Sequence, residues 1–168
     1  MKRVARLIKH RLWDETDTRR ALPPAALARI EARIAASEQG HSGEIRVSVE
    51  AGLPLSYLWK GLRARDRAIA QFGKLRVWDT EHNNGVLIYL LLAEHAIEIV
   101  ADRGLNRHVS RAQWQALIEP MQRDFRAGRF EDGLNRAIAA TDGLLRQHFA
   151  LAPGEFNPNE LPNRPHLS

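Results

Sequence analysis

Residues 83–104 read NNGVLIYLLLAEHAIEIVADRG and contain two apolar runs that only a short polar break separates. The runs, 86–92 and 96–101, have the length of β-strands. A connection of a few residues can join antiparallel strands, but it cannot hold the crossover that parallel strands need. We therefore predict a hairpin whose open end brings Asn83-Asn84-Gly85 beside Asp102-Arg103-Gly104.

Hydrophobic periodicity places helices before and after this hairpin. A further strand is predicted at residues 44–50, where apolar and polar side chains alternate as they do in a strand with one buried face. In chain order we expect a helix from Pro24 to Gly40, the strand at 44–50, a helix over 58–73, the hairpin, a helix capped by Ser110 and kinked or divided at Pro120, and a helix over 130–149.

This order of elements predicts an α/β fold, specifically a single-domain three-layer α/β/α sandwich with a small mixed sheet. The strand at 44–50 should run parallel to the strand at 86–92 and reach it by a right-handed crossover. Residues 86–92 are apolar on both faces, as in a central strand, whereas Glu98 marks residues 96–101 as an edge strand protected by charge. We assign the domain to residues 23–149, between a basic helical extension at 1–22 and a Pro-rich tail at 150–168 that should be extended or mobile rather than packed.

Composition narrows the classes of protein and of site. The chain has 168 residues and a net charge of +5. It has no cysteine, and this absence excludes disulfides, thiolate metal sites and cysteine nucleophiles. Its longest apolar run is far shorter than the roughly 20 residues of a membrane-spanning helix. Basic and apolar residues are interleaved at the N-terminus, so no signal peptide is expected. We therefore expect a soluble, cytoplasmic protein.

Much of the positive charge lies near the N-terminus, at Lys2, Arg3, Arg6, Lys9, Arg11, Arg19 and Arg20. The rest of the chain is nearly balanced in charge, so nucleic acid is not expected as a partner. A basic amphipathic helix over residues 1–12 could make a peripheral contact with an anionic membrane. It could equally pack on its own domain, because a helix this short is marginal unless something covers its apolar side. Both interpretations remain open.

Parallel pairing of 44–50 with 86–92 brings the beginnings of both strands to the end of the sheet that also carries residue 102. We call the polar residues gathered there the open-end cluster: Glu44, Asp79, Thr80, Glu81, Asn83, Asn84, Asp102 and Arg103. The neighbouring glycines let the backbone turn sharply and permit the close approach of a ligand. The guanidinium fork of Arg103 suits phosphate oxygens. Carboxylate and amide oxygens suit a hard divalent cation such as Ca²⁺ or Mg²⁺.

From this chemistry we predict Asp102 and Arg103 as catalytic residues, Asn84, Glu44 and Thr80 as ligand-binding residues, and Asp102, Asn83 and Glu81 as metal ligands. No nucleophile stands out. A second interpretation is that Asp102-Arg103-Gly104 forms only a capped turn and that Asn84-Gly85 only begins a strand, because Gly, Asn and Asp are the usual turn residues.

Other common chemistries are not supported. The chain contains no HExxH, P-loop or GxGxxG pattern. His95 is expected at the hairpin turn, about 20 Å from His82 and His108 at about 3.3 Å per residue, so these histidines cannot form a zinc triad. Three tryptophans are expected as core or partly buried anchors rather than as stacking platforms for bases: Trp59, Trp78 and Trp114.

Several segments occur together in a characteristic order: GEIRV at 43–47, NGVLI at 84–88, IEIVADRG at 97–104, and then Trp114, Phe125 and Gly128. In these segments the chain resembles the TPM domain family, also called the TPM phosphatase family. The resemblance implies an α/β/α sandwich. It also implies a link to thylakoid or bacterial envelope proteins, for some of which acid phosphatase activity and divalent metal binding have been proposed. Many members carry an acidic residue where this chain has Asn83.

Two functional hypotheses follow. The first is a TPM domain protein that binds a divalent cation, Ca²⁺ or Mg²⁺, and acts as an acid-phosphatase-type hydrolase. The second is a non-catalytic interaction module that acts near the membrane or with envelope proteins, through a protein partner that the sequence does not identify.

Overall fold

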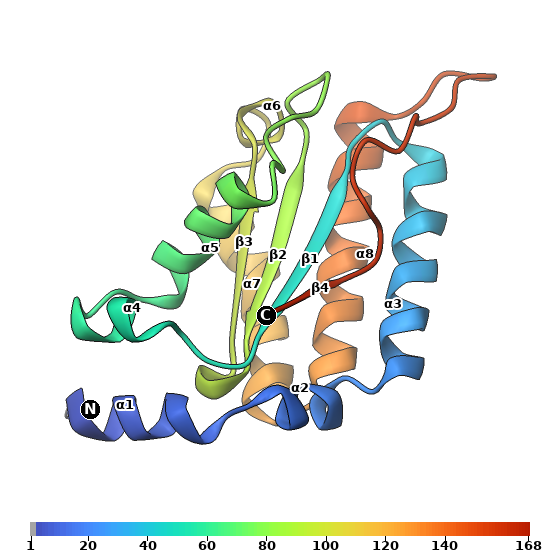
Figure 1. Ribbon diagram of the computed structural model, residues 1–168. Helices are drawn as coiled ribbons and strands as arrows, with labels where there is room; N and C mark the ends of the chain where they lie inside the picture. Colours follow the sequence, from blue (N-terminus) through green and yellow to red (C-terminus); the bar gives the residue numbers. More distant parts are fainter. Residues whose placement is uncertain (1–2) are drawn as a thin grey trace.

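A computed structural model describes residues 3–168, apart from the side chains of Arg3 and Glu15, and shows a mixed sheet between layers of helices (Figure 1). Within these residues the sheet has the strand order β3-β2-β1-β4. The strands are β1 (Ile45–Glu50), β2 (Val86–Leu91), β3 (Ala96–Ala101) and β4 (His166–Leu167). The helices are α1 (Arg3–Leu12), α2 (Glu15–Ala21), α3 (Pro24–Ser37), η1 (Glu38–Gly40), α4 (Leu55–Trp59), α5 (Ala64–Lys74), η2 (Leu92–Glu94), α6 (Arg103–Asn106), α7 (Arg111–Arg126) and α8 (Phe130–Phe149).

The sheet confirms the predicted hairpin and the predicted parallel pair. β1 and β2 run parallel with Ile45 opposite Val86, and β2 and β3 run antiparallel with Val86 opposite Ala101. The hairpin turns through η2 and His95, whose φ of 49° lies in the left-handed region. β3 is an edge strand, as the position of Glu98 predicts, and β4 forms the other edge.

Alternate side chains of β2 belong to two separate cores, which explains why the strand is apolar on both faces. One set packs with α3, α7 and α8: Val86, Ile88 and Leu90. The other packs with α4 and α5: Leu87, Tyr89 and Leu91. All six are fully buried. The predicted three-layer α/β/α sandwich is therefore confirmed, with β2 at its centre.

One of the predicted helices differs from the structure. The region expected as one helix over 58–73 forms two, α4 and α5, because the chain turns at Gly61, whose φ of 70° is a conformation that glycine adopts readily. α7 runs through Pro120 as one element, so the chain is not divided there. The expected helix from Pro24 to Gly40 is α3 followed by the short helix η1.

The C-terminal tail packs on the domain, although the sequence predicted an extended or mobile segment that does not pack. β4 adds to β1 in parallel, with Ser48 opposite His166. The Arg46 guanidinium donates hydrogen bonds to the carbonyl oxygens of Pro162 and Arg164. A strand of two residues shows no alternation of side chains, so the sequence pattern could not reveal it.

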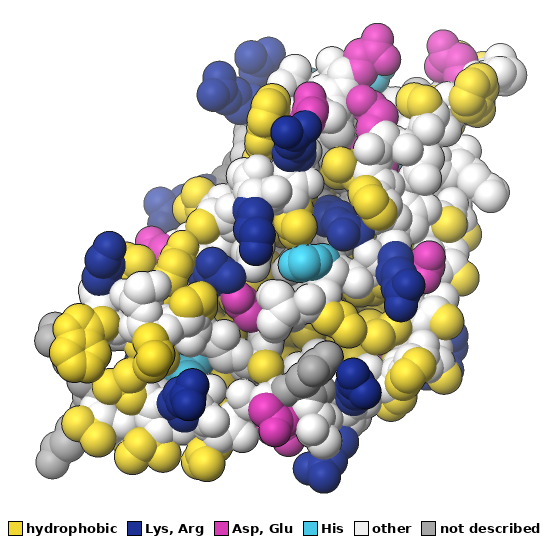
Figure 2. Space-filling view, viewed as in Figure 1, with side chains coloured by type: hydrophobic (Ala, Val, Ile, Leu, Met, Phe, Trp, Pro, Cys, Tyr) yellow, Lys and Arg dark blue, Asp and Glu magenta, His cyan; other side chains and the backbone are white. Residues whose placement is uncertain are grey.

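The N-terminal helix α1 lies across the end of the sheet where η2 is found, beside α4, while residues 1 and 2 lie outside the described part of the chain (Figure 1). Of the three tryptophans expected to be at least partly buried, Trp114 is half-buried but Trp59 and Trp78 are exposed. Short α4 buries Leu58 and turns Trp59 outward. Hydrophobic side chains gather at the surface near α1 and α4 (Figure 2). Between residues 3 and 168 no helix is both long and apolar enough to cross a membrane.

Candidate functional site

The ends of three strands meet at the open end of the hairpin, as their predicted pairing requires. The N–H of Val86 donates to the Glu44 carbonyl oxygen at 2.8 Å, and the N–H of Asp102 donates to the Gly85 carbonyl oxygen at 2.9 Å. One turn further, the N–H of Gly104 donates to the Asn83 carbonyl oxygen at 2.9 Å. Backbone hydrogen bonds thus hold the segments of the open-end cluster side by side.

The glycines at this end allow the chain to approach itself. A Cβ atom on Gly85 would lie 1.9 Å from the Val77 carbonyl oxygen, and a Cβ on Gly104 would lie 2.5 Å from the Asn83 carbonyl oxygen. Real Cβ atoms do not come so close to backbone. The sequence suggested that these glycines make room for a ligand, but the space is taken by the loop that precedes β2.

Asn84 is fully buried at the start of β2. Its backbone N–H donates to the Thr80 hydroxyl at 3.1 Å, and its side-chain Nδ2 donates to the Ser42 hydroxyl at 3.2 Å. Within the described residues its Oδ1 atom has no hydrogen-bond partner. Asn84 therefore ties three segments together and keeps one buried acceptor oxygen free.

Asp102 is 8% exposed and serves as the N-cap of α6. Its Oδ1 accepts a hydrogen bond of 2.6 Å from the N–H of Arg103. Its Oδ2 is buried and, in the part of the chain that the structure covers, has no hydrogen-bond partner. The capped-turn interpretation therefore accounts for one carboxylate oxygen of Asp102 and leaves the other available.

The remaining predicted ligands of the metal and phosphate lie at the surface. Arg103, Asn83 and Glu81 are exposed, as is Asp79. Asn83 has a φ of 51°, a left-handed conformation that Asn tolerates better than most residues. The backbone N–H of Glu81 donates to the Glu160 carboxylate at 3.2 and 3.3 Å. Across residues 3–168, no group of three His, Asp or Glu side chains is placed to hold a metal ion.

Glu44 belongs to a buried acidic pair that holds the tail. It is fully buried, and its Oε2 accepts a hydrogen bond of 3.1 Å from the N–H of Leu161. Burial raises the pKa of Glu44. Glu38 accepts a hydrogen bond of 3.0 Å from the N–H of Ile45, and burial, with a smaller contribution from the charge of Glu44, raises the pKa of Glu38 to about 8. The tail thus occupies one carboxylate oxygen of the predicted ligand Glu44, while the other, Oε1, is buried and has no hydrogen-bond partner among the described residues.

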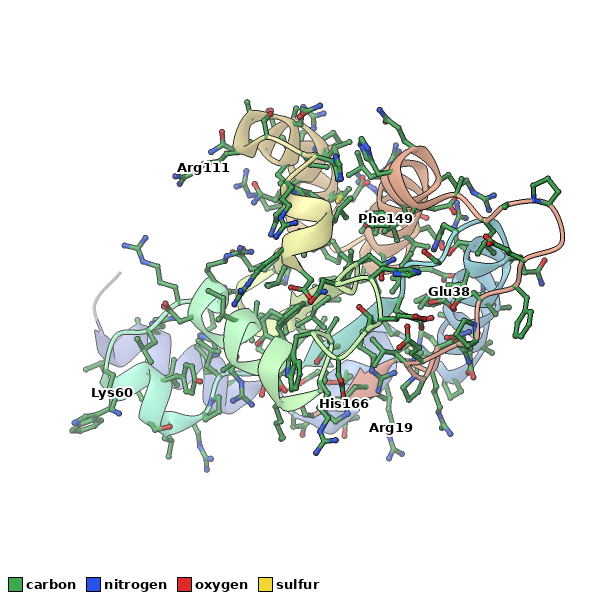
Figure 3. All side chains as sticks on the ribbon, turned by 90° about the horizontal axis from the view of Figure 1, so that it is seen from above. Arg19, Glu38, Lys60, Arg111, Phe149 and His166 are labelled. Carbon is green, nitrogen blue, oxygen red and sulfur yellow. The ribbon has the colours of Figure 1, made fainter. Side chains whose placement is uncertain are left out.

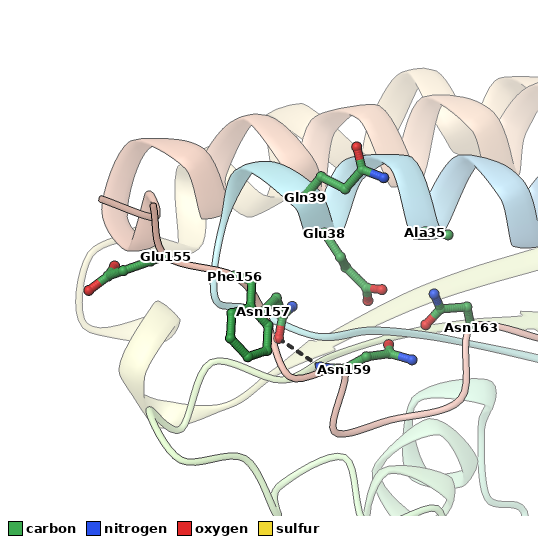
Figure 4. A pocket seen from close by; sticks show the side chains of 8 residues that line it. All are labelled: Ala35, Glu38, Gln39, Glu155, Phe156, Asn157, Asn159 and Asn163. Carbon is green, nitrogen blue, oxygen red and sulfur yellow. Dashed lines mark hydrogen bonds between the residues drawn. The ribbon is translucent and has the colours of Figure 1, made fainter. Parts of the chain in front are cut away.

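A cavity of about 320 Å³ lies beside Glu38, under the loop of the tail (Figure 4). We call it the acid–amide pocket; its lining includes Glu38, Gln39, Asn157, Asn159 and Asn163. Figure 4 shows the Glu38 carboxyl group directed toward the loop that carries the asparagines. Sequence reasoning missed this pocket, because Glu38 follows an ordinary amphipathic helix and the asparagines lie far along the chain.

A second cavity, of about 470 Å³, adjoins the open-end cluster. Its lining includes Ser42, Glu81, His82, Phe149 and Phe156. Figure 3 looks down onto this end of the molecule and shows Phe149, at the end of α8, on the same side as Glu38. The tail thus separates two hollows, one next to the open-end cluster and one next to Glu38.

Comparison with known proteins identifies the family of this chain. The family model for the TPM domain matches residues 16–144. Among solved structures, the chain is similar to the NMR structure of BA42 from the psychrophilic bacterium Bizionia argentinensis, with 29% identity, a TM-score of 0.75, and coverage of 88% of this chain and 95% of that one.

A second solved structure supports the fold alone. It is the solution NMR structure of the N-terminal domain of a protein from P. gingivalis, with 20% identity, a TM-score of 0.60, and coverage of 78% of this chain and 82% of that one. No curated protein matches the sequence. The family match spans most of the chain and includes β1, the hairpin and α7. The chain therefore belongs to the TPM domain family.

Proposed function

We propose that the open-end cluster binds a divalent cation and that the protein is a phosphatase-like hydrolase of the TPM domain family. The observation that supports this proposal is the pair of unpartnered oxygens, Asp102 Oδ2 and Asn84 Oδ1, both buried at the open end of the hairpin. A buried acceptor without a partner costs about 1–3 kcal/mol, which a bound cation would offset. Carboxylate and amide oxygens are the ligands that Ca²⁺ and Mg²⁺ prefer.

The charge at the cluster favours a cation that keeps part of its water shell. Asp102 supplies one buried carboxylate, and the exposed side chains of Asn83 and Glu81 offer further oxygens from the surface. Mg²⁺ is commonly held by one or two carboxylates together with water and substrate phosphate. A bound cation would supply charge stabilisation to a phosphate ester. Arg103, exposed beside Asp102, would bind the phosphate oxygens through its guanidinium group.

Calorimetric titration of the metal-free protein with Ca²⁺, Mg²⁺ and Mn²⁺ tests cation binding. Asp102→Asn is the sharpest variant, because Asn is also a good N-cap and the change removes the charge with little loss of the cap. Exposed Asp132, in the first turn of α8, provides the charge-matched control Asp132→Asn. We expect saturable binding that Asp132→Asn retains and that Asp102→Asn weakens at least about tenfold, because a carboxylate ligand is lost. A flat titration of the unmodified protein would refute the proposal.

Hydrolysis is tested separately with para-nitrophenyl phosphate and the cation that binds most tightly. Turnover should fall on Asp102→Asn and remain on Asp132→Asn. Arg103→Gln should raise KM more than it lowers kcat if the guanidinium group contributes mainly to phosphate binding. Cation binding without turnover would leave a binding protein and remove the hydrolase assignment.

The alternative function, a non-catalytic interaction module near the membrane, is favoured by a different part of the molecule. Hydrophobic and basic side chains lie together on α1 and α4, at the far end of β2 from the open-end cluster (Figures 1 and 2). The two functions use separate surfaces, so they do not exclude each other.

A further inference from the structure

Helix α1 is attached to the domain by its polar side. His10 is 4% exposed; its Nδ1 accepts a hydrogen bond of 3.0 Å from the N–H of Leu53, and its Nε2 lies 3.0 Å from Glu94 Oε1. Arg6 donates to the same Glu94 oxygen at 2.7 Å and to the Leu62 carbonyl oxygen at 2.8 Å. Glu94, at the hairpin turn, is therefore the acidic anchor of α1. The helix is also held by the backbone contacts at Leu53 and Leu62 and by Leu7, which packs against the core.

The apolar side of α1 faces solvent as a result. Val4, Ile8 and Leu12 follow one another at intervals of four residues and are 65%, 55% and 73% exposed. At about 100° per residue, they form one stripe on the side of the helix opposite Arg6 and His10. An amphipathic helix on a globular domain normally buries its apolar stripe against the core. Here the domain leaves that stripe uncovered.

Helix α4 extends this apolar area. It packs beside α1 and exposes Leu55 and Trp59, also four residues apart, at 55% and 78%. We define the α1–α4 surface by its five exposed hydrophobic residues: Val4, Ile8, Leu12, Leu55 and Trp59. In Figure 2, hydrophobic side chains gather at the lower left, where Figure 1 places these two helices.

Basic side chains border the α1–α4 surface. Around the axis of α1, Arg11 lies along one edge of the stripe and Lys9 along the other. Lys60 and Arg63 follow Trp59 and are exposed. Among the side chains that the structure describes, none of these four cations forms an ion pair. Neither 4–12 nor 55–65 contains an acidic residue.

This combination of charge and apolar area distinguishes between possible partners. A second copy of the chain, related by a two-fold axis, would bring Lys9, Arg11 and Lys60 toward the same charges on its partner, and like charges across an interface are unfavourable. An anionic bilayer offers negative headgroups to the cations and an apolar boundary to the stripe. Tryptophan favours the interface between lipid and water, where Trp59 would lie.

We propose that the α1–α4 surface docks the protein on membranes that contain anionic lipids. α1 lies flat on the bilayer with Val4, Ile8 and Leu12 inserted at the level of the headgroups, while Lys9 and Arg11 bind lipid phosphates. Docking uses side chains that are already outside the core, so the fold does not change. The proposal does not depend on the activity of the open-end cluster.

Vesicle flotation tests the proposal with the full chain. The probes are vesicles of phosphatidylcholine alone and of phosphatidylcholine mixed with phosphatidylglycerol. We expect binding to the mixed vesicles that weakens about fivefold for each charge removed by Lys9→Gln and Arg11→Gln. Ile8→Ser should weaken binding at least about tenfold, because it removes an inserted apolar side chain. Phe156→Ser is the matched control, since Phe156 is 80% exposed but lies in the tail, and it should bind like the unmodified protein.

Tryptophan emission gives a second readout of the same surface. The mixed vesicles should shift the emission of the unmodified protein to shorter wavelength, and Trp59→Phe should abolish most of that shift although three other tryptophans remain. Absence of vesicle binding would overturn the proposal, as would binding that Ile8→Ser and Lys9→Gln leave unchanged. Light scattering that shows a dimer dissociated by Ile8→Ser, without vesicle binding, would assign the surface to a second copy and overturn it as well.

Discussion

The two ends of β2 combine burial and polarity in opposite ways. At the end of the sheet where β2 begins, the polar side chains of Asn84 and Asp102 are buried. At the end where β2 finishes, the apolar side chains of the α1–α4 surface are exposed. Backbone hydrogen bonds and close packing fix the first end, whereas α1 is held at the second end mainly by side-chain contacts, two of which are made to Glu94. A buried polar group without a partner and an exposed apolar group both indicate a surface that a binding partner would complete. The first suggests a small ion, and the second suggests an extended surface.

The most destabilising substitution that we predict lies at the polar end. Gly85→Ala would place a methyl carbon 1.9 Å from the Val77 carbonyl oxygen, and that backbone atom can move only with its whole loop. We expect the free energy of unfolding to fall by about 3 kcal/mol in urea titrations followed by circular dichroism. Gly143→Ala is the control, because no atom lies within 4 Å of its added Cβ, and it should stabilise α8 by about 1 kcal/mol. Equal stability of the two variants would mean that the loop is not tightly packed on β2.

A smaller effect is expected from Glu38, next to the polar end. The ordinary pKa of 4.5 is raised to about 8 in the folded state, mainly by burial. Between these values the folded protein retains a proton that the unfolded chain has lost, so this group makes stability fall as pH rises from about 4.5 to about 8. Glu38→Gln, which carries a neutral amide, should gain roughly 1–3 kcal/mol over the unmodified protein at pH 9 and little at pH 4. Parallel pH profiles of unfolding in the two proteins would contradict this assignment.

The smallest expected effect on global stability is at the apolar end. Hydrogen bonding from His10, followed by the contacts of Arg6, lowers the pKa of Glu94 from 4.5 to about 2. The stabilisation of the folded protein by ionised Glu94 is therefore fully present above about pH 4.5 and is lost as pH falls toward 2. Glu94→Gln should release α1 and speed amide hydrogen exchange in residues 4–12 at pH 7 by about tenfold, with little change in β2.

Glu98→Gln is the matched control for that variant. Glu98 belongs to β3, and its Oε2 atom lies 3.6 Å from Nη1 of Arg65. Among the described residues it forms no ion pair with α1. The Glu98→Gln variant should leave amide hydrogen exchange in residues 4–12 unchanged. If both variants release α1 equally, the charge of the hairpin region as a whole holds the helix, and Glu94 is not its specific anchor.

Much of the fold could be predicted because it depends on the pattern of apolar residues and on the lengths of the connections between strands. The brief connection at Glu94-His95 required an antiparallel hairpin, and the long crossover from β1 required a parallel pair. Those two inferences were sufficient to bring Asn84 beside Asp102. The TPM domain resemblance, carried by the same segments, is confirmed by the family match.

The sequence could not predict contacts made by individual atoms over long separations. The backbone N–H of Leu161 donates to the Glu44 carboxylate, and Arg46 donates to two carbonyl oxygens of the tail. The sequence around these residues contains no pattern that indicates such partners. The tail and the acid–amide pocket were therefore missed. The exposure of Trp59 was also missed, because the short helix α4 buries Leu58 and leaves Leu55 and Trp59 on its outward face.

The length of β2 has a consequence for what a docked protein could act on. β2 has six residues, so its two ends lie about 20 Å apart at about 3.3 Å per residue. If α1 rests on a bilayer, the open-end cluster stands at that height above the headgroups and faces water. Phospholipids would then be beyond its reach, and its substrates would be phosphate compounds dissolved in the aqueous layer next to the membrane.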